Sequence, residues 1–284
     1  MRNYKPQQFL SNSNCNSSPK LYSDNQAMER YYCLEVNGDY SFTNCQWHGC
    51  RHSSNGSCIF LVNSSSSLSI ERSSFTNCNI QAGNGGAIYL YQINKAHIYD
   101  SSFLRCNILS YSHPEHGGGF VSLELVSQEV LIKSSCFCDS SVPSDAGGVD
   151  IWYCSCTTGN THTFQDCRFS KCKGTGSEGG GIMAWRNTYN VRISNTLFTE
   201  SSNRDGCGFK MYVTETFSSP FITFCFFHRN TATNGKDIYF SNCESNPILH
   251  SFTTTNEPYT VIPERWSTQT KEDNWLQKID TINV

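Results

Sequence analysis

A short glycine-containing segment recurs along the chain and constrains the fold more than any other feature. It reads GNGGAIYL (83–90), HGGGFVSL (116–123), DAGGVDIW (145–152), EGGGIMAW (178–185), DGCGFKMY (205–212) and NGKDIYFS (234–241). A segment that returns about every thirty residues indicates stacked repeat units, because one unit cannot bury its apolar face alone. The sequence therefore predicts a repeat protein.

Aligning these segments gives columns of similar residues. The apolar residue after each glycine cluster forms one column, with spacings of 29, 32, 29, 33, 27 and 29 residues: Ile59, Ile88, Phe120, Val149, Ile182, Phe209 and Ile238. Three residues before it stands a small residue: Gly56, Gly85, Gly117, Ala146, Gly179, Gly206 and Gly235. A mainly aromatic column reads Trp47, Phe75, Phe103, Cys136, Phe169, Phe198 and Phe227. Five positions earlier lies an apolar column: Phe42, Ile70, Ile98, Leu131, Phe164, Ile193 and Ile222.

Three short apolar strands in each period favour an all-β fold, a right-handed parallel β-helix of about seven coils of roughly 30 residues. A leucine-rich repeat has a shorter period, and a propeller blade needs about 40 residues. The expected organisation is an N-terminal segment with a capping helix (1–30), a β-helix (31–243) and a C-terminal cap and tail (244–284). The helix is predicted over 23–32, SDNQAMERYY, where Ser23 and Gln26 form a capping box.

Many of the 16 cysteines fall in register with the repeat. Two columns of small residues flank the aromatic column and contain Cys45, Cys50, Cys78, Cys106, Cys167, Cys172 and Cys225. The favoured interpretation is that they are small buried residues stacked along a core. A disulfide or metal ladder is the alternative, but C-x-C pairs without C-x-x-C or histidine partners do not match a zinc site, so no metal or cofactor is expected. If cross-links form, they are expected among the residues outside the columns: Cys15, Cys33, Cys154, Cys156 and Cys243.

The chain resembles proteins with the polymorphic outer membrane protein type of repeat, in which a GGAI-like tetrapeptide alternates with F-x-x-N. GGAI stands at 85–88, GGGF at 117–120 and GGGI at 179–182, and F-x-x-N is intact at 227–230. It is also similar to cysteine-containing β-helix surface proteins of parasitic protists. This resemblance implies a pectin-lyase-like superfamily fold and a cell-surface or secreted adhesin.

Composition limits the partners and the location. The net charge is −3, so no strongly basic surface is expected to recruit nucleic acid. No window approaches the ~20 apolar residues of a membrane span, so no membrane insertion is expected, and the sequence as written shows no export signal. The resemblance and the cysteines favour an extracellular or cell-surface location, whereas the missing signal favours the cytoplasm. The exterior is the preferred prediction.

Two sets of residues are candidates for chemistry. Arg72, Asp100, Lys133 and Asp166 lie three residues before the aromatic column and would form an alternating charge ladder; Asp100 and Asp166 could bracket a glycosidic bond, with Lys133 between them. The residues after the glycine-linked column would face outward and include the candidate ligand-binding residues Tyr89, Asp150, Lys210 and Tyr239. Exposed aromatic side chains there could stack on sugar rings, but the favoured interpretation is that they lie partly buried under long turns.

The preferred function is a non-enzymatic scaffold that binds glycans or partner proteins through turns 107–116, 154–163 and 173–178, which vary in length. A polysaccharide lyase or glycoside hydrolase of the same fold is the first alternative. An intracellular structural repeat protein is the second.

Overall fold

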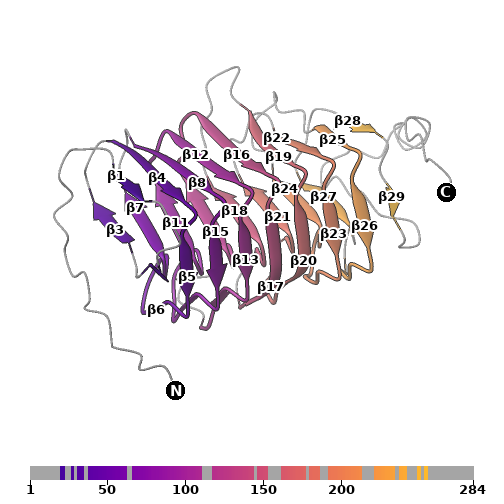
Figure 1. Cartoon of the computed structure of the whole chain (residues 1–284). Helices are drawn as coiled ribbons and strands as arrows, with labels where there is room; N and C mark the ends of the chain where they lie inside the picture. Colours follow the sequence, from indigo (N-terminus) through magenta and orange to yellow (C-terminus); the bar gives the residue numbers. More distant parts are fainter. Residues whose placement is uncertain are drawn as a thin grey trace.

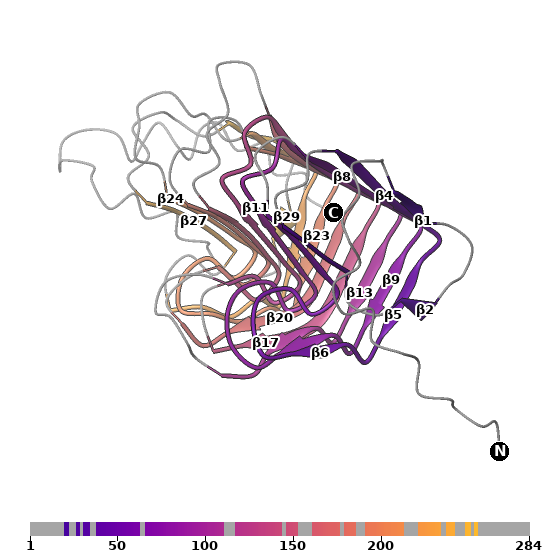
Figure 2. The same ribbon diagram turned by 90° about the vertical axis from the view of Figure 1, so that its left-hand side faces the viewer.

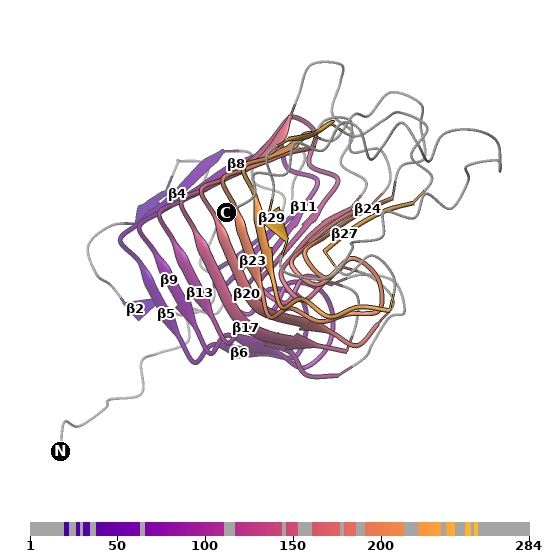
Figure 3. The ribbon, with the colours of Figure 1, turned by 90° about the vertical axis from the view of Figure 1, so that its right-hand side faces the viewer.

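The protein is a parallel β-helix in which every coil contributes strands to the same sheets (Figure 1). The computed structural model describes residues 20–22, 27–28, 31–34, 38–62, 66–110, 117–143, 146–152, 161–176, 179–185, 191–212, 221–233, 237–241, 248–250 and 253–254. Figures 2 and 3 view the rod from its two ends and show the sheets as faces around a common interior. Within these described ranges, no helix has the length and apolar content needed to cross a membrane.

Four parallel sheets make up the coils. Sheet A contains β1 (Lys20–Tyr22), β4 (Asp39–Thr43), β8 (Ser67–Glu71), β12 (Lys95–Tyr99), β16 (Glu129–Lys133), β19 (His162–Gln165), β22 (Val191–Ser194), β25 (Phe221–Thr223) and β28 (Ile248–His250). Sheet B contains β2 (Ala27–Met28), β5 (Gln46–His48), β9 (Ser74–Thr76), β13 (Ser102–Leu104), β17 (Cys136–Val142), β20 (Arg168–Gly174), β23 (Leu197–Thr199), β26 (Phe226–His228) and β29 (Thr253–Thr254). Sheet C contains β3 (Tyr31–Leu34), β7 (Ile59–Val62), β11 (Ile88–Tyr91), β15 (Val121–Glu124), β18 (Val149–Trp152), β21 (Ile182–Trp185), β24 (Phe209–Tyr212) and β27 (Ile238–Ser241). The short sheet D contains β6 (Arg51–His52), β10 (Asn79–Ile80) and β14 (Asn107–Ile108).

The predicted fold class is confirmed by this pairing. Each strand of sheets A, B and C pairs in parallel with the equivalent strand one period away, for example Ile59 with Ile88 and Phe75 with Phe103. A repeat in which each coil contacts only its neighbours distributes stability over coil-to-coil interfaces. The right-handed winding stays a prediction, since strand pairing does not test it.

The aromatic column forms a continuous stack inside the rod. Neighbouring rings lie nearly parallel, with interplanar angles of 1° to 11° and centroids 4.3 to 5.2 Å apart. The stack consists of Trp47, Phe75, Phe103, Phe137, Phe169, Phe198 and Phe227. All seven side chains are buried, so this column is the centre of the core.

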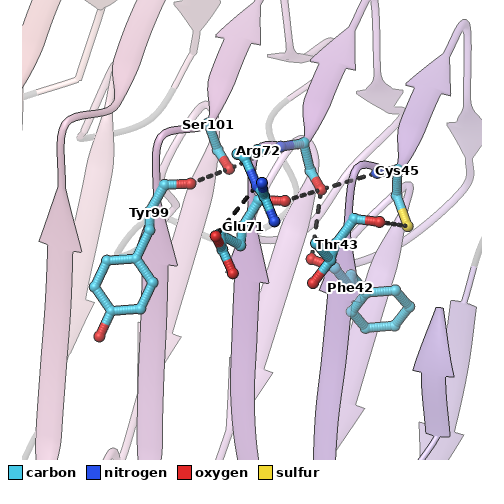
Figure 4. Close-up of polar contacts among 8 residues, drawn as sticks. Phe42, Thr43, Cys45, Glu71, Arg72, Tyr99 and Ser101 are labelled. Atoms are coloured by element: carbon cyan, nitrogen blue, oxygen red, sulfur yellow. Dashed lines mark hydrogen bonds and ion pairs between the residues drawn. The ribbon is translucent and has the colours of Figure 1, made fainter. Parts of the chain in front are cut away.

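A column of small side chains connects the coils by hydrogen bonds at the corner between sheets A and B (Figure 4). The Ser73 hydroxyl donates to the Glu71 carbonyl at 2.9 Å and accepts from the backbone N–H of Cys45 at 3.1 Å. The Ser101 hydroxyl likewise donates to the Tyr99 carbonyl at 2.6 Å. A thiol can take the same place, since Cys45 Sγ lies 3.6 Å from the Thr43 carbonyl. The column therefore needs a small side chain with a donor, which serine, threonine and cysteine all supply.

Six of the seven cysteines in these columns are buried, as predicted, and Cys50 is half-buried. The structure holds no disulfide among the eleven cysteines whose side chains it describes. Burial raises the pKa of the Cys167 and Cys225 thiols to about 12, so both stay protonated and act as weak donors. The cross-links expected among Cys15, Cys33, Cys154, Cys156 and Cys243 fall on side chains outside the described residues.

The corners of each coil place residues other than glycine in the left-handed region. One corner column follows the strands of sheet A. The other follows the short strands of sheet B and lies within β17 and β20, which continue past it. The first reads Asn44, Arg72, Asp100, Ser134, Asp166, Asn195 and Phe224, and the second reads Asn77, Arg105, Asp139, Lys171, Glu200 and Arg229, all with φ between 47° and 62°. The second column alternates in charge from Arg105 to Arg229, and Lys171 Nζ lies 3.8 Å from Glu200 Oε2. Nine of these thirteen corner N–H groups donate to the next coil, as Arg105 does to the Cys138 carbonyl at 3.0 Å, so coil pairing holds the turns in this conformation.

One coil is shifted by one residue from the predicted alignment. Ile88 pairs with Val121 rather than Phe120, Ile98 pairs with Ile132 rather than Leu131, and Phe103 pairs with Phe137 rather than Cys136. A shift of one residue exchanges the two faces of a strand.

The physical reason for this error lies in three consecutive glycines, 117–119. A Cβ at Gly118 would collide with the carbonyl oxygen three residues later, as it would at Gly56 and Gly85. Gly118 is therefore the equivalent corner residue. The prediction was wrong because Phe120, Leu131 and Cys136 are all apolar, so composition alone did not reveal the shift.

The ends of the rod also differ from the prediction. The helix predicted over 23–32 is wrong, since β2 and β3 are strands that pair with β5 and β7. An open coil exposes unpaired backbone N–H and C=O groups, and pairing with this edge outweighs the local helix-capping signal. At the other end β28 and β29 extend sheets A and B, so the repeat continues into the region predicted as a cap. The rest of that region, from residue 255, lies outside the described residues.

A buried histidine in sheet A gives stability a pH dependence. His162 is fully buried, and its Nδ1 accepts the backbone N–H of Val130 at 3.2 Å, which requires a neutral ring. Burial lowers the pKa of His162 from 6.5 to about 4. As the pH falls, the imidazole of His162 therefore becomes protonated in the unfolded chain at a higher pH than in the folded protein. Stability from this group is complete above pH 6.5 and decreases by roughly 3 kcal/mol between pH 6.5 and 4.

We expect His162→Gln to remove this part of the acid sensitivity, because glutamine can accept the same hydrogen bond without titrating. Urea unfolding of both proteins at several pH values measures the difference. Parallel pH profiles for the two proteins would contradict the expectation.

Candidate functional site

The candidate residues for catalysis, Asp100, Lys133 and Asp166, lie at or beside the corner between sheets A and B. Asp100 and Asp166 occupy equivalent corner positions with φ of 47° and 55°, and Ser134, not Lys133, takes the position between them. Lys133 is the last residue of β16 and pairs with Tyr99 and Gln165. The prediction that Lys133 stacks between the two carboxylates is therefore wrong, for the same one-residue shift.

The contacts of this corner do not form the predicted alternating ladder. Arg72 Nε lies 3.2 Å from Glu71 Oε1 in its own coil (Figure 4). Asp166 Oδ1 accepts the Asn195 side-chain amide at 2.6 Å. Alternating charges instead occupy the corner that follows sheet B, described above.

The predicted ligand-binding residues lie on the outer face of sheet C but are buried. Tyr89, Asp150, Lys210 and Tyr239 are 0 to 6% exposed. Tyr89 donates to Glu124 Oε2 at 2.7 Å, and Lys210 Nζ lies 5.0 Å from the centre of the Tyr239 ring. Trp152, Met183 and Ala146 form a separate apolar cluster. This burial agrees with the favoured interpretation that the aromatic side chains of this column are buried rather than exposed for stacking on sugar rings.

A polar groove of about 830 Å³ is a better candidate for a binding site. Three turns from consecutive coils line it: Gly174, Thr175 and Gly176; Ser202, Asn203 and Arg204; Thr231, Ala232 and Thr233. Backbone hydrogen bonds fix these turns, with Gly174 N–H donating to the Ser202 carbonyl at 3.0 Å and Asn203 N–H to the Thr231 carbonyl at 3.2 Å. The groove therefore has a rigid floor.

The groove lies where the fourth side of the rod changes. In earlier coils this side forms the strands of sheet D, and β17 and β20 extend through it. In the described part of the next coils, the pairing continues as isolated bridges from Lys173 to Ser202 and from Ser202 to Thr231. The polar side chains of the later coils thus line an open surface instead of a sheet.

Asn203 holds the middle turn in place. Its Nδ2 donates to the Gly179 carbonyl at 3.0 Å, and its Oδ1 accepts the N–H of Arg204 at 2.6 Å. Its backbone N–H lies 3.1 Å from Cys207 Sγ. The Asn203 side chain is therefore used within the protein and fixes the start of the Arg204 turn.

Asp205, which follows the groove residue Arg204, forms a buried ion pair. Asp205 Oδ2 lies 3.4 Å from Lys210 Nζ, and both side chains are almost fully buried. The same oxygen lies 3.6 Å from Arg204 Nη2, whose side chain is 59% exposed. One carboxylate is thus shared by two cations, so the exposed guanidinium keeps net positive charge at the groove.

Of the turns predicted to bind ligand, only 173–178 contributes to the groove; residues 111–116 and 154–160 of the other two lie outside the described residues. The turns at 202–204 and 231–233 were missed. They occupy the same place in the repeat as 174–176, just after the second small-residue column, and that alignment could have found them.

Three cysteines lie close enough to share a metal ion among the side chains that the structure describes. They are Cys50, Cys58 and Cys78. The sequence predicted no metal because the C-x-C pairs lack the partners of a zinc site. Cys58, which stands outside the predicted columns, was not considered.

Comparison of the chain with protein-family models, with curated proteins and with solved structures returns no match. The parallel β-helix is shown by the strand pairing itself. The specific repeat family and the pectin-lyase-like superfamily remain predictions from the sequence resemblance.

Proposed function

We propose that this protein is a non-enzymatic β-helix scaffold, secreted or at the cell surface, that binds an acidic glycan in the groove formed by residues 174–176, 202–204 and 231–233. The observation that carries the proposal is the groove itself, in which turns from three consecutive coils present polar groups on a rigid rod. Repeat proteins place variable binding residues on such turns while the core columns stay regular.

The chemistry of the lining suits a polyhydroxylated ligand with a carboxylate. Thr175, Thr231 and Thr233 are exposed and carry hydroxyl groups that both donate and accept hydrogen bonds. Arg204 is the charged side chain of the lining, and a guanidinium binds a carboxylate through two parallel hydrogen bonds. A glycan that contains uronic or sialic acid offers both kinds of group.

The environment of Asp205, which adjoins the groove residue Arg204, favours a binding function over a catalytic one. Glycoside hydrolysis needs a pair of carboxyl groups, one of which donates a proton. Asp205 is buried and paired with Lys210 and Arg204, and the residues that line the groove include no aspartate or glutamate.

The test compares wild type with Arg204→Gln on acidic and neutral oligosaccharides by calorimetry. We expect wild type to bind the acidic set, and Arg204→Gln to weaken binding about 10-fold or more, because a hydrogen bond to a charged group contributes about 1.5–3 kcal/mol. Arg168→Gln is the matched control, since Arg168 is exposed on β20 outside the groove. Equal binding by wild type and Arg204→Gln would contradict the site, and release of cleaved products would favour the lyase or hydrolase alternative.

A further inference from the structure

Cys50, Cys58 and Cys78 converge in the N-terminal part of the rod. Cys50 and Cys78 are successive members of the column that follows sheet B, and the N–H of Asn79 donates to the Cys50 carbonyl at 2.8 Å. Cys58 immediately precedes β7 in sheet C. The three Sγ atoms all lie within 4.8 Å of one another.

The repeat shows that this meeting is specific to one coil. The residue before each sheet C strand forms its own column: Cys58, Ala87, Phe120, Gly148, Gly181, Gly208 and Asp237. The column of Cys58 also contacts the column of Cys50 and Cys78 at the far end of the rod. There Asn230 Nδ2 donates to Asp237 Oδ1 at 3.0 Å. The two columns therefore face each other within a coil, and only the coil with Cys58 places sulfur in both.

Two of the three cysteines in the cluster are inaccessible to solvent. Cys58 and Cys78 are fully buried in the main apolar core, and Cys50 is partly buried against it. Burial first, then the neighbouring thiols, raise the pKa of Cys58 well above its usual value. Three thiolates would repel one another strongly here, so a bound cation is needed to hold the thiolate form.

We propose that Cys50, Cys58 and Cys78 form a three-coordinate thiolate site for a soft cation, Cu(I). Thiolate ligands favour Cu(I), and the cluster contains neither histidine nor carboxylate, whereas structural zinc sites use four protein ligands. Metal–sulfur bonds of ~2.3 Å place three sulfur atoms ~4 Å apart, so binding needs only a small inward movement of the side chains. Each thiol releases its proton to solvent as it binds, and copper that arrives as Cu(I) exchanges no electron.

Cys78→Ser and Cys106→Ser provide the matched test. Both residues belong to the same column and the same kind of turn, and Ser140 and Ser201 show that this column accepts serine, but only Cys78 belongs to the cluster. Reduced, oxygen-free protein is titrated with Cu(I) against a coloured Cu(I) chelator. Cys58→Ala is a second variant, since Ala87 holds the equivalent position in the next coil.

We expect wild type and Cys106→Ser each to retain one Cu(I) against the chelator. Cys78→Ser and Cys58→Ala should lose it, because their affinity for Cu(I) is expected to be at least about 100-fold weaker. Cu(I) should also raise the thermal midpoint of the first pair and not of the second. Equal retention by Cys78→Ser and Cys106→Ser would overturn the site. A Cys50–Cys58 or Cys58–Cys78 disulfide in the mass spectrum of the native protein would overturn it as well.

Discussion

Phe137→Ala is expected to lower the free energy of unfolding by about 3–5 kcal/mol. Phe137 is fully buried, and its ring lies 4.8 Å from both Phe103 and Phe169 in the aromatic stack. The truncation removes apolar contacts and leaves a cavity between two rings that the strands hold in place. Urea unfolding followed by circular dichroism measures the loss.

Cys136→Ala is the control for this prediction. Cys136 precedes Phe137 in β17 and is exposed, so its truncation is expected to change stability by no more than about 0.5 kcal/mol. The two adjacent substitutions test the register of the coil directly. If Cys136→Ala lowered the free energy of unfolding more than Phe137→Ala, the alignment predicted from the sequence would be correct and the register in the structure would be wrong.

Asp205→Asn is expected to destabilise the protein by about 3–5 kcal/mol, because it leaves the Lys210 cation buried beside a neutral amide. The Asp205 and Lys210 side chains are only 6% and 5% exposed. Adding Lys210→Met removes the buried charge and is expected to recover part of the loss. Denaturant midpoints of the single and double variants measure both effects.

Glu200→Gln is the isosteric control, since it breaks the pair of Lys171 and Glu200, whose side chains are 52% and 47% exposed. Exposed pairs contribute about 0–1 kcal/mol. Equal losses for Asp205→Asn and Glu200→Gln, or no recovery in the double variant, would show that burial of the Lys210 charge is not what makes Asp205 necessary.

The fold was predictable because the repeat shows it many times over. A column such as Phe75, Phe103 and Phe169 keeps one chemical character through many coils, and only a stacked architecture explains that regularity. The small-residue columns were predictable for the same reason. What single residues could not show was that Ser73 and Cys45 are selected for a hydrogen bond between coils as well as for size.

The errors have two physical origins. The glycine run 117–119 offers two corner positions, and only the collision at Gly118 identifies the correct one. The helix expected over 23–32 rested on a local capping signal, and only pairing with the open edge of the next coil shows that strands β2 and β3 form there.

The groove illustrates a further limit of sequence reasoning. Thr231, Ser202 and Gly174 look like ordinary turn residues one at a time, and they become a site only because equivalent turns stack. The thiol cluster is similar, since Cys58 gains meaning only from the column that it faces. Both sites depend on contacts between coils, which the sequence encodes only after the register is known.

The charged corner after sheet B bears on how such a chain could gain or lose coils over time. Arg105, Asp139, Lys171 and Glu200 alternate in sign from one coil to the next. Deleting a single coil would place like charges on adjacent rungs, which is unfavourable, whereas deleting or duplicating two coils together would keep opposite charges adjacent. Adding or removing coils two at a time therefore preserves the charge pattern at this corner, over a length twice that of the structural repeat.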